Sequence, residues 1–139
     1  MVLNALQRLG QATPAKTSYV SGFHLLPGSL ALLPPTLTAT FSSIDADAAY
    51  MAESKGKSWL SYQPRIKAKL DHGVLVVGEK TWEVRLKVVA RADFDGDGID
   101  DLLISIGQSA TQGTFASTKL LLMTRMTPTS RLVTLERLQ

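Results

Sequence analysis

The feature that most limits the fold of this chain is an alternation of apolar and polar residues between positions 82 and 91, broken only by one valine. Its apolar positions are Trp82, Val84, Leu86, Val88 and Ala90, and the positions between them are Glu83, Arg85, Lys87, Val89 and Arg91. Successive side chains of a β-strand point to opposite faces of a sheet. A repeat of two residues therefore predicts a strand with one buried face.

The same repeat occurs upstream, where Ile66, Ala68 and Leu70 alternate with Arg65, Lys67 and Lys69. Turns at residues 71–73 and 78–80 bracket a further apolar strand at residues 74–77. More strands are expected at residues 102–106, 119–126 and 132–138, with a polar loop at 107–117 and a turn at 128–130. The C-terminal two-thirds is thus predicted to be an antiparallel meander of about six strands.

The N-terminal part has a different pattern. Apolar residues at helical spacing predict a short helix over residues 1–10, and residues 19–26 are interpreted as a strand. The alanine-rich segment 45–55 begins with aspartates and ends with lysines, which suits a helix dipole, and Gly56 would end that helix. We therefore expect an α+β fold in a single domain, 1–139. Its residues 1–58 would be helical or irregular, and its residues 59–139 would form the β-meander.

Five aspartates fall within nine residues, in the stretch Asp93–Asp101. Calcium takes six to eight oxygen ligands, and a flexible loop can supply them. The carboxylates of Asp93, Asp95 and Asp97 occupy loop positions one, three and five, and Gly98 permits the sharp turn that follows. The backbone carbonyl of Ile99 and the side chain of Asp101 would complete the ligand set. The sequence therefore predicts a calcium site in this loop.

Position twelve of the loop distinguishes it from a helix–loop–helix calcium hand, which has a bidentate glutamate there. In this chain that position is Ile104, inside an apolar strand pattern. The segment that enters the loop is strand-like as well. The loop is therefore expected to join two strands, and Asp101 would have to take the role of the missing glutamate.

The stretch of residues 92–104, Ala-Asp-Phe-Asp-Gly-Asp-Gly-Ile-Asp-Asp-Leu-Leu-Ile, resembles the calcium loop of FG-GAP and VCBS-type repeats. That resemblance covers about 20 residues and implies that Asp93, Asp95, Asp97 and Asp101 are the ligands. The family builds propellers from several such loops, whereas this chain has one, which argues against a propeller. The adhesion role of the family does not follow from a single loop.

The alternative to a metal site is a solvated turn without an ion, but a plain turn does not require five closely spaced negative charges. Calcium is favoured over magnesium, because magnesium prefers fewer protein ligands and retains its waters. We expect the ion to be structural and to clamp two central strands, and a directly functional ion is the alternative.

The formal net charge of the chain is +3, and without the five loop aspartates it would be +8 (3 + 5). Six cations lie on the predicted outer positions of the strands, namely Arg65, Lys67, Lys69, Arg85, Lys87 and Arg91. If the two strands were neighbours, these like charges would face each other. One explanation is solubility, and the other is a surface that binds an acidic partner. Neither a recognition helix nor interleaved aromatics indicates nucleic acid.

Catalytic signatures are absent from the sequence: there is no cysteine, no nucleophile elbow and no zinc-binding motif. The two histidines, His24 and His72, are interpreted as an ordinary strand residue and a turn residue. No apolar stretch is long enough to span a membrane. A calcium-dependent phosphoesterase is a weaker alternative, because such enzymes need further metal ligands or a second ion.

These observations predict a calcium-binding, non-enzymatic protein-interaction domain. Its specific form would be an inhibitor or immunity protein acting on a secreted toxin or hydrolase, with an acidic protein as partner. The alternative is a glycan-binding module at the cell surface, with Trp59, Tyr62 and Trp82 as candidate aromatics. We expect a bacterial protein of the periplasm or the extracellular space, where millimolar calcium fills a site of modest affinity, and whose leader is not part of this sequence. A cytoplasmic protein is the alternative.

Overall fold

The computed structural model describes residues 10, 12–21, 23–111 and 116–137. The helix predicted over residues 1–10 lies outside this set except for Gly10. Among the described residues, no helix is long and apolar enough to cross a membrane.

The architecture is an α+β fold built on a six-stranded antiparallel sheet in which the strands follow one another in chain order. The strands are β1 (Lys67–Asp71), β2 (Val74–Gly78), β3 (Trp82–Ala92), β4 (Asp101–Ala110), β5 (Ala116–Thr124) and β6 (Val133–Arg137). The predicted meander is thereby confirmed. The predicted loop at 107–117 is largely wrong, because β4 and β5 pair as far as Ser109 and Ala116.

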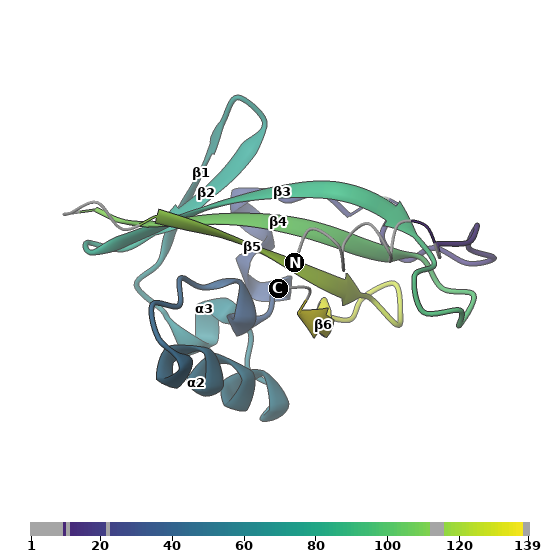
Figure 1. The fold of residues 1–139 in the computed structure, drawn as a ribbon, viewed down its shortest axis with the longest axis horizontal. Helices are drawn as coiled ribbons and strands as arrows, with labels where there is room; N and C mark the ends of the chain where they lie inside the picture. The colour runs from purple at the N-terminus through teal and green to yellow at the C-terminus, as the bar shows by residue number, and fades with distance from the viewer. Residues whose placement is uncertain (1–9, 11, 22, 112–115, 138–139) are drawn as a thin grey trace.

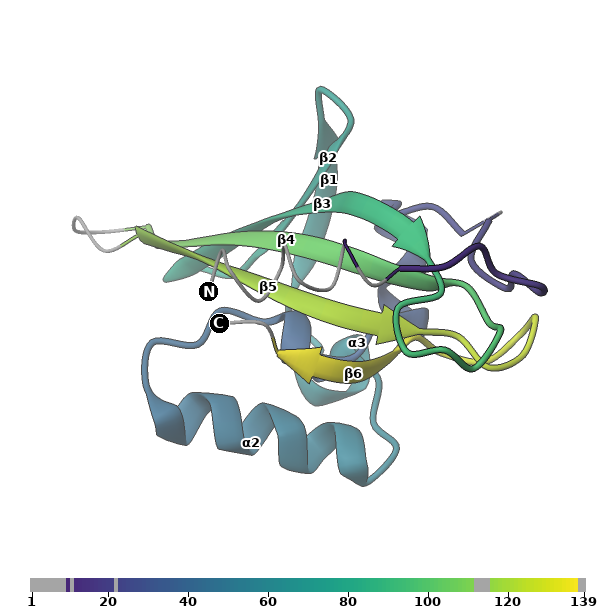
Figure 2. The same ribbon diagram turned by 45° about the vertical axis from the view of Figure 1, so that its right-hand side comes forward.

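The N-terminal half forms a layer of short helices beside the sheet (Figures 1 and 2). They are η1 (Pro27–Leu32), η2 (Pro35–Leu37), α2 (Ser43–Ser54) and α3 (Trp59–Tyr62). Helix α2 confirms the predicted helix, and its N-cap is the Ser42 side chain, which accepts a hydrogen bond from the Asp45 amide. The strand predicted at residues 19–26 is wrong: the described residues of this range, 19–21 and 23–26, form no strand and lead into η1.

The main hydrophobic core lies between this layer and one face of the sheet. Trp59 of α3 is fully buried and stacks on Trp82 of β3, with ring centroids 6.5 Å apart. The indole N–H of Trp59 donates to Oε1 of Gln63, so the buried polar atom is satisfied. Trp59 therefore joins the helical layer to the sheet, and it is not an exposed glycan-binding residue as the sequence had suggested.

A β-bulge between Val88 and Ala90 changes which face of the sheet each later side chain occupies. Before the bulge Val88 pairs with Ile104 of the main core, whereas after it Arg91 pairs with Leu102, which belongs to the same core. Ala90 accordingly packs in a second cluster on the opposite face. That cluster contains Phe94, Leu103 and Leu122, with Ala12, Ala90, Ala92 and Leu120 against it.

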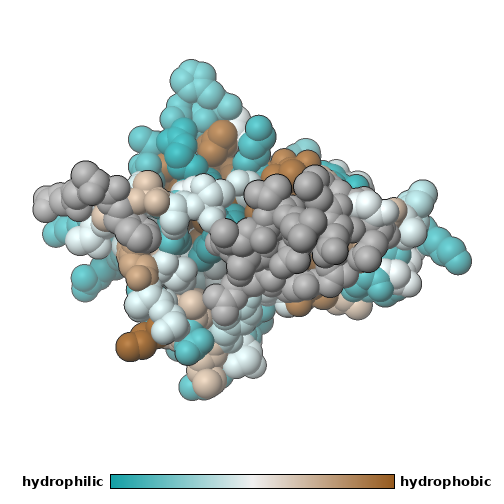
Figure 3. Space-filling model, in the orientation of Figure 1, coloured by the Kyte–Doolittle hydropathy of each residue, from teal (hydrophilic) through white to brown (hydrophobic). Residues whose placement is uncertain are grey.

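The β1–β2 hairpin projects from the sheet (Figure 1), and its surface is mainly hydrophilic (Figure 3). Its turn residues, His72 and Gly73, both have positive φ angles, 52° and 82°. This pair of angles is typical of a type I′ turn, which matches the twist of a two-stranded hairpin. The turn confirms the predicted break between the two strands.

Candidate metal centre

The acidic loop connects β3 to β4, whose ends are held together by the pairing of Ala92 with Asp101. Phe94 is buried in the second cluster and anchors the start of the loop to the sheet. Gly98 has a φ of +83°, a backbone conformation that residues with a side chain rarely adopt. These constraints fold the loop back on itself and bring four of its aspartates together.

Four of the five aspartates come together: Asp93, Asp95, Asp97 and Asp101. Each offers one carboxylate oxygen, and these oxygens all lie within 4.8 Å of one another. Asp93 and Asp101 are buried, while Asp95 and Asp97 are exposed. The group can therefore hold a metal ion, reached from the solvent side of the two exposed carboxylates.

Hydrogen bonds within the loop fix the orientation of the first carboxylates. Both oxygens of Asp93 accept backbone N–H groups, from Gly96 at 2.8 Å and from Gly98 at 2.7 Å. Oδ1 of Asp97 accepts the amide of Ile99 at 2.9 Å. Because a carboxylate oxygen has more than one lone pair, these bonds leave acceptor capacity for a cation.

The pKa values within the loop differ because the environments differ. Burial acts to raise the pKa of Asp93, but the N–H groups of Gly98 and Gly96 outweigh it and lower that pKa below its usual value. The pKa of Asp95 is raised, first by burial and next by the adjacent carboxyl of Asp97. The carboxylates thus repel one another, and a bound cation would relieve that repulsion.

Asp101 is the most unusual member of the group. It is fully buried, and its Oδ2 accepts the amide of Phe94 at 2.9 Å. Neither its Oδ1 nor the hydroxyl of Thr124, the residue that it pairs with on β5, makes a close hydrogen bond among the described residues. Burial raises the pKa of Asp101 to about 6, against the opposing effects of the Phe94 amide and of the neighbouring Thr124 hydroxyl. A buried polar atom without a close partner destabilises a fold, and a bound cation could supply the interaction that this oxygen lacks.

A segment that the sequence did not predict packs against the loop: residues 12–18, here termed the N-terminal strap. The amides of Lys16 and Thr17 both donate to the carbonyl of Gly98, at 2.9 and 3.0 Å. The amide of Asp100 donates to the carbonyl of Thr17 at 2.9 Å. These bonds form isolated bridges without a side-chain repeat, so periodicity could not reveal them.

The fifth loop aspartate, Asp100, is not part of the cluster. Its Oδ2 accepts a hydrogen bond from the hydroxyl of Ser18 at 2.9 Å, which adds a side-chain contact between loop and strap. The carbonyl of Ile99, predicted as a ligand, accepts no hydrogen bond from the described residues. This carbonyl therefore keeps its capacity to accept a further interaction.

The six predicted partner-binding cations do not form one face. β2 lies between β1 and β3, so Lys69 and Arg85 are separated by Val76 and do not face each other directly. The Arg85 guanidinium forms an ion pair with Asp71 at 2.8 Å. Arg91 is on the core side because of the bulge, and its guanidinium donates to the backbone carbonyls of Val20 and Phe23. The prediction that Arg91 occupies an outer position together with Arg85 and Lys87 is therefore wrong.

The remaining candidates are dispersed. Trp82 is buried in the core, and Tyr62 is half-buried at the end of α3. His72 is exposed at the hairpin tip, where its Nδ1 lies 2.7 Å from Oδ1 of Asp71. His24 is exposed in the irregular segment before η1.

No family model, no curated protein and no solved structure matches this chain. The likeness to FG-GAP and VCBS-type loops is therefore limited to the loop itself, where the clustered aspartates are compatible with a calcium-binding acidic loop.

Proposed function

We propose that this chain is a calcium-binding domain whose single ion is bound by Asp93, Asp95, Asp97 and Asp101. The observation that supports this most strongly is the fully buried Asp101: its Oδ1 makes no close hydrogen bond among the described residues, and one of its oxygens lies within 4.8 Å of an oxygen of each of three other carboxylates. A cation would supply the missing interaction and offset the repulsion within the group.

Calcium fits this ligand set better than magnesium. Four carboxylates and the carbonyl of Ile99 offer at least five oxygens from the protein, and bidentate binding by Asp101 would add a sixth. Calcium accepts six to eight such ligands in flexible geometry, whereas magnesium keeps several waters and requires a near-octahedral arrangement.

The ion in this proposal has a structural role. The loop closes the ends of β3 and β4 and also binds the N-terminal strap through backbone bonds at Gly98 and Asp100. Neutralising the loop would favour this folded arrangement over an open one. The strap continues directly into Val20 and Phe23, which belong to the main core. Calcium binding would therefore stabilise the strap at the loop and also where it continues into the main core.

The domain would act by binding another protein and not by catalysis. Its outer surface on β1 is cationic, which favours an acidic partner. An inhibitor or immunity protein against a secreted toxin or hydrolase is the specific form of this proposal, in the periplasm or outside the cell. Glycan binding is less favoured, because two of its three candidate aromatics, Trp59 and Trp82, are buried.

The test is a calorimetric titration of calcium into chelator-treated protein, with magnesium as the comparison. The proposal requires one site per chain and a weaker or undetectable response to magnesium. A calcium titration without heat at millimolar concentration, together with an unchanged melting temperature, would refute the metal site.

A further inference from the structure

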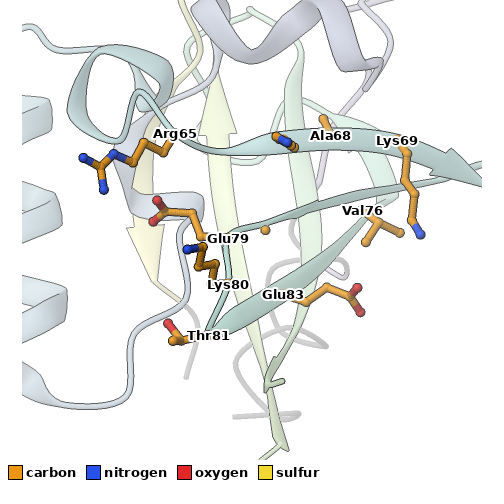
Figure 4. Close-up of a pocket in the computed structure, with 10 residues that line it drawn as sticks. Arg65, Ala68, Lys69, Val76, Glu79, Lys80, Thr81 and Glu83 are labelled. Atoms are coloured by element: carbon orange, nitrogen blue, oxygen red, sulfur yellow. The ribbon is translucent and has the colours of Figure 1, made fainter. Parts of the chain in front are cut away.

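A hollow of about 740 Å³ lies where the projecting β1–β2 hairpin leaves the sheet (Figure 4). Its lining includes four cations, Arg65, Lys67, Lys69 and Lys80, and two carboxylates, Glu79 and Glu83. Three of the cations come from β1 and the residues just before it, whereas both carboxylates come from the β2–β3 side. The volume lies in the range of ligand-binding pockets, roughly 300–1,000 Å³.

The cations of this hollow are only weakly offset by the carboxylates near them: Lys69 is close enough to Asp71 to contribute to the lowered pKa of that carboxyl. None of the four forms an ion pair within 4.0 Å with a carboxylate of the described residues. Lys67 and Lys69 are two positions apart on β1, so their side chains lie on the same face of the strand. Like charges so close together repel, and an anionic partner would relieve that repulsion.

β1 is also an edge strand, since it is the first in the sheet order and pairs with β2 alone. The two-residue turn makes Asp71 and Val74 a hydrogen-bonded pair, and hydrogen-bonded and non-bonded pairs then alternate along the ladder. The N–H and C=O groups of Ala68 and Leu70 therefore face away from β2. No backbone bond joins them to another element among the described residues.

The clustered cations and the free backbone groups lie on the same strand, and together they indicate which kind of partner would bind there. We propose that an extended acidic segment of another protein pairs with the free edge of β1 and places alternate carboxylates opposite Lys67 and Lys69. Strand addition supplies backbone hydrogen bonds to Ala68 and Leu70, and the period of two sets the acid-x-acid pattern of the partner. This inference rests on the proposed protein-binding role and is independent of the calcium ion.

The probe is a fluorescently labelled octapeptide in which glutamate and threonine alternate, measured by fluorescence anisotropy. The comparison peptide has the same composition in the order Glu-Glu-Thr-Thr-Glu-Glu-Thr-Thr, in which no two glutamates are two positions apart. We expect the alternating peptide to bind at least about tenfold more tightly, because only it can place carboxylates opposite both Lys67 and Lys69 on one face of a paired strand. Equal binding of the two peptides would indicate a nonspecific polyanion site and overturn the proposal, as would no binding at millimolar peptide.

The charge requirement is tested with the double variant Lys67→Gln/Lys69→Gln. The matched control is Lys55→Gln/Lys57→Gln, which removes the same charge from exposed positions at the end of α2. The first variant should weaken binding of the alternating peptide by about tenfold, and the control should leave it within about twofold. Equal losses in both variants would contradict a specific role for β1.

The backbone requirement is tested with Leu70→Pro, which removes the edge N–H while keeping every charge. Proline is tolerated on an edge strand where its nitrogen faces solvent, and the Leu70 side chain is 48% exposed. Leu70→Thr is the control, because it loses the same side chain but keeps the N–H. We expect a loss of about tenfold for the proline variant only. Equal affinities of the two variants would exclude strand pairing.

If Leu70→Pro fails to fold, the same question is answered with the unmodified protein. Slower hydrogen exchange at the Ala68 and Leu70 amides on addition of the alternating peptide would support strand pairing, and unchanged exchange would overturn it. All measurements are made with calcium and with chelator. A missing calcium response with peptide binding intact refutes only the metal site, and the reverse result refutes only the strand-addition site.

Discussion

Two neighbouring aspartates in the metal loop have opposite surroundings. Asp100 accepts a hydrogen bond from Ser18 and lies outside the carboxylate cluster. Asp101 is fully buried inside it and has an oxygen without a partner among the described residues. The two side chains are chemically identical and adjacent, so they provide a matched test of which carboxylates bind the ion.

We predict that Asp101→Asn weakens calcium binding by on the order of 100-fold, equivalent to about 2.7 kcal/mol, because it removes a negative ligand from the centre of the site. Asp100→Asn should change the affinity by less than about threefold, since its oxygen can still accept the Ser18 hydrogen bond. Calorimetric titration of both variants measures the difference. Similar affinities for the two variants would mean that Asp101 is not a ligand.

The raised pKa of Asp101 predicts how the stability of the calcium-free protein varies with pH. Its folded-state pKa is about 6, above the ordinary value of 3.8, so the folded protein binds the proton more tightly than the unfolded chain does. This contribution is present in full below about pH 4 and is lost as the pH rises through about 6.

Melting temperatures measured in chelator between pH 4 and pH 7 should therefore fall more steeply for the unmodified protein than for Asp101→Asn. The lowered pKa of Asp93 has the opposite sign and is present in both proteins, so the prediction concerns the difference between their two pH profiles. Parallel pH profiles would show that Asp101 does not titrate in this range.

At the scale of elements, the metal loop and the N-terminal strap form one unit through the amides of Lys16, Thr17 and Asp100. Because calcium favours the closed loop, we predict that it slows hydrogen exchange at these three amides by about tenfold or more. The amide of Leu121 in β5, which pairs in the middle of the sheet, is the internal control and should not change. Equal exchange rates of the strap amides with and without calcium would show that the stability of the strap does not depend on the ion.

The elements differ in how well the sequence predicted them. β1, β2 and β3 were predicted because alternation of side chains is a direct consequence of strand geometry, and α2 because its charges and alanines suit a helix. The bulge after Val88 was missed, since no glycine or proline marks it, and with it the placement of Arg91. Helix α3 was missed because four residues are too few to establish a period.

The metal loop was predictable because its ligands are contiguous in the sequence, so their spacing alone brings them together. The burial of Asp101 and the strap bonds depend on tertiary contacts that no local pattern encodes. The same limit explains the aromatic residues. The burial of Trp82 was predictable from the alternation of its strand. Trp59 belongs to no repeat, and it is buried because α3 packs on the sheet.

At the scale of the whole molecule, Trp59 connects the two layers that enclose the main core. We predict that Trp59→Ala lowers the free energy of unfolding by about 3–5 kcal/mol, because it leaves a cavity and removes the contact with Trp82. Leu60→Ala in the same helix should cost less than about 1 kcal/mol, since that side chain is 37% exposed. Denaturant unfolding compares the two, and equal losses would contradict the interlayer role of Trp59.

The central claim is that one calcium ion occupies the loop between β3 and β4, and a crystal structure of the protein grown with calcium tests it most directly. The account predicts one ion with oxygens of Asp93, Asp95, Asp97 and Asp101 at roughly 2.3–2.6 Å. It also predicts that Oδ1 of Asp101 is among them. A structure from calcium-saturated crystals in which the loop contains only water would contradict the account.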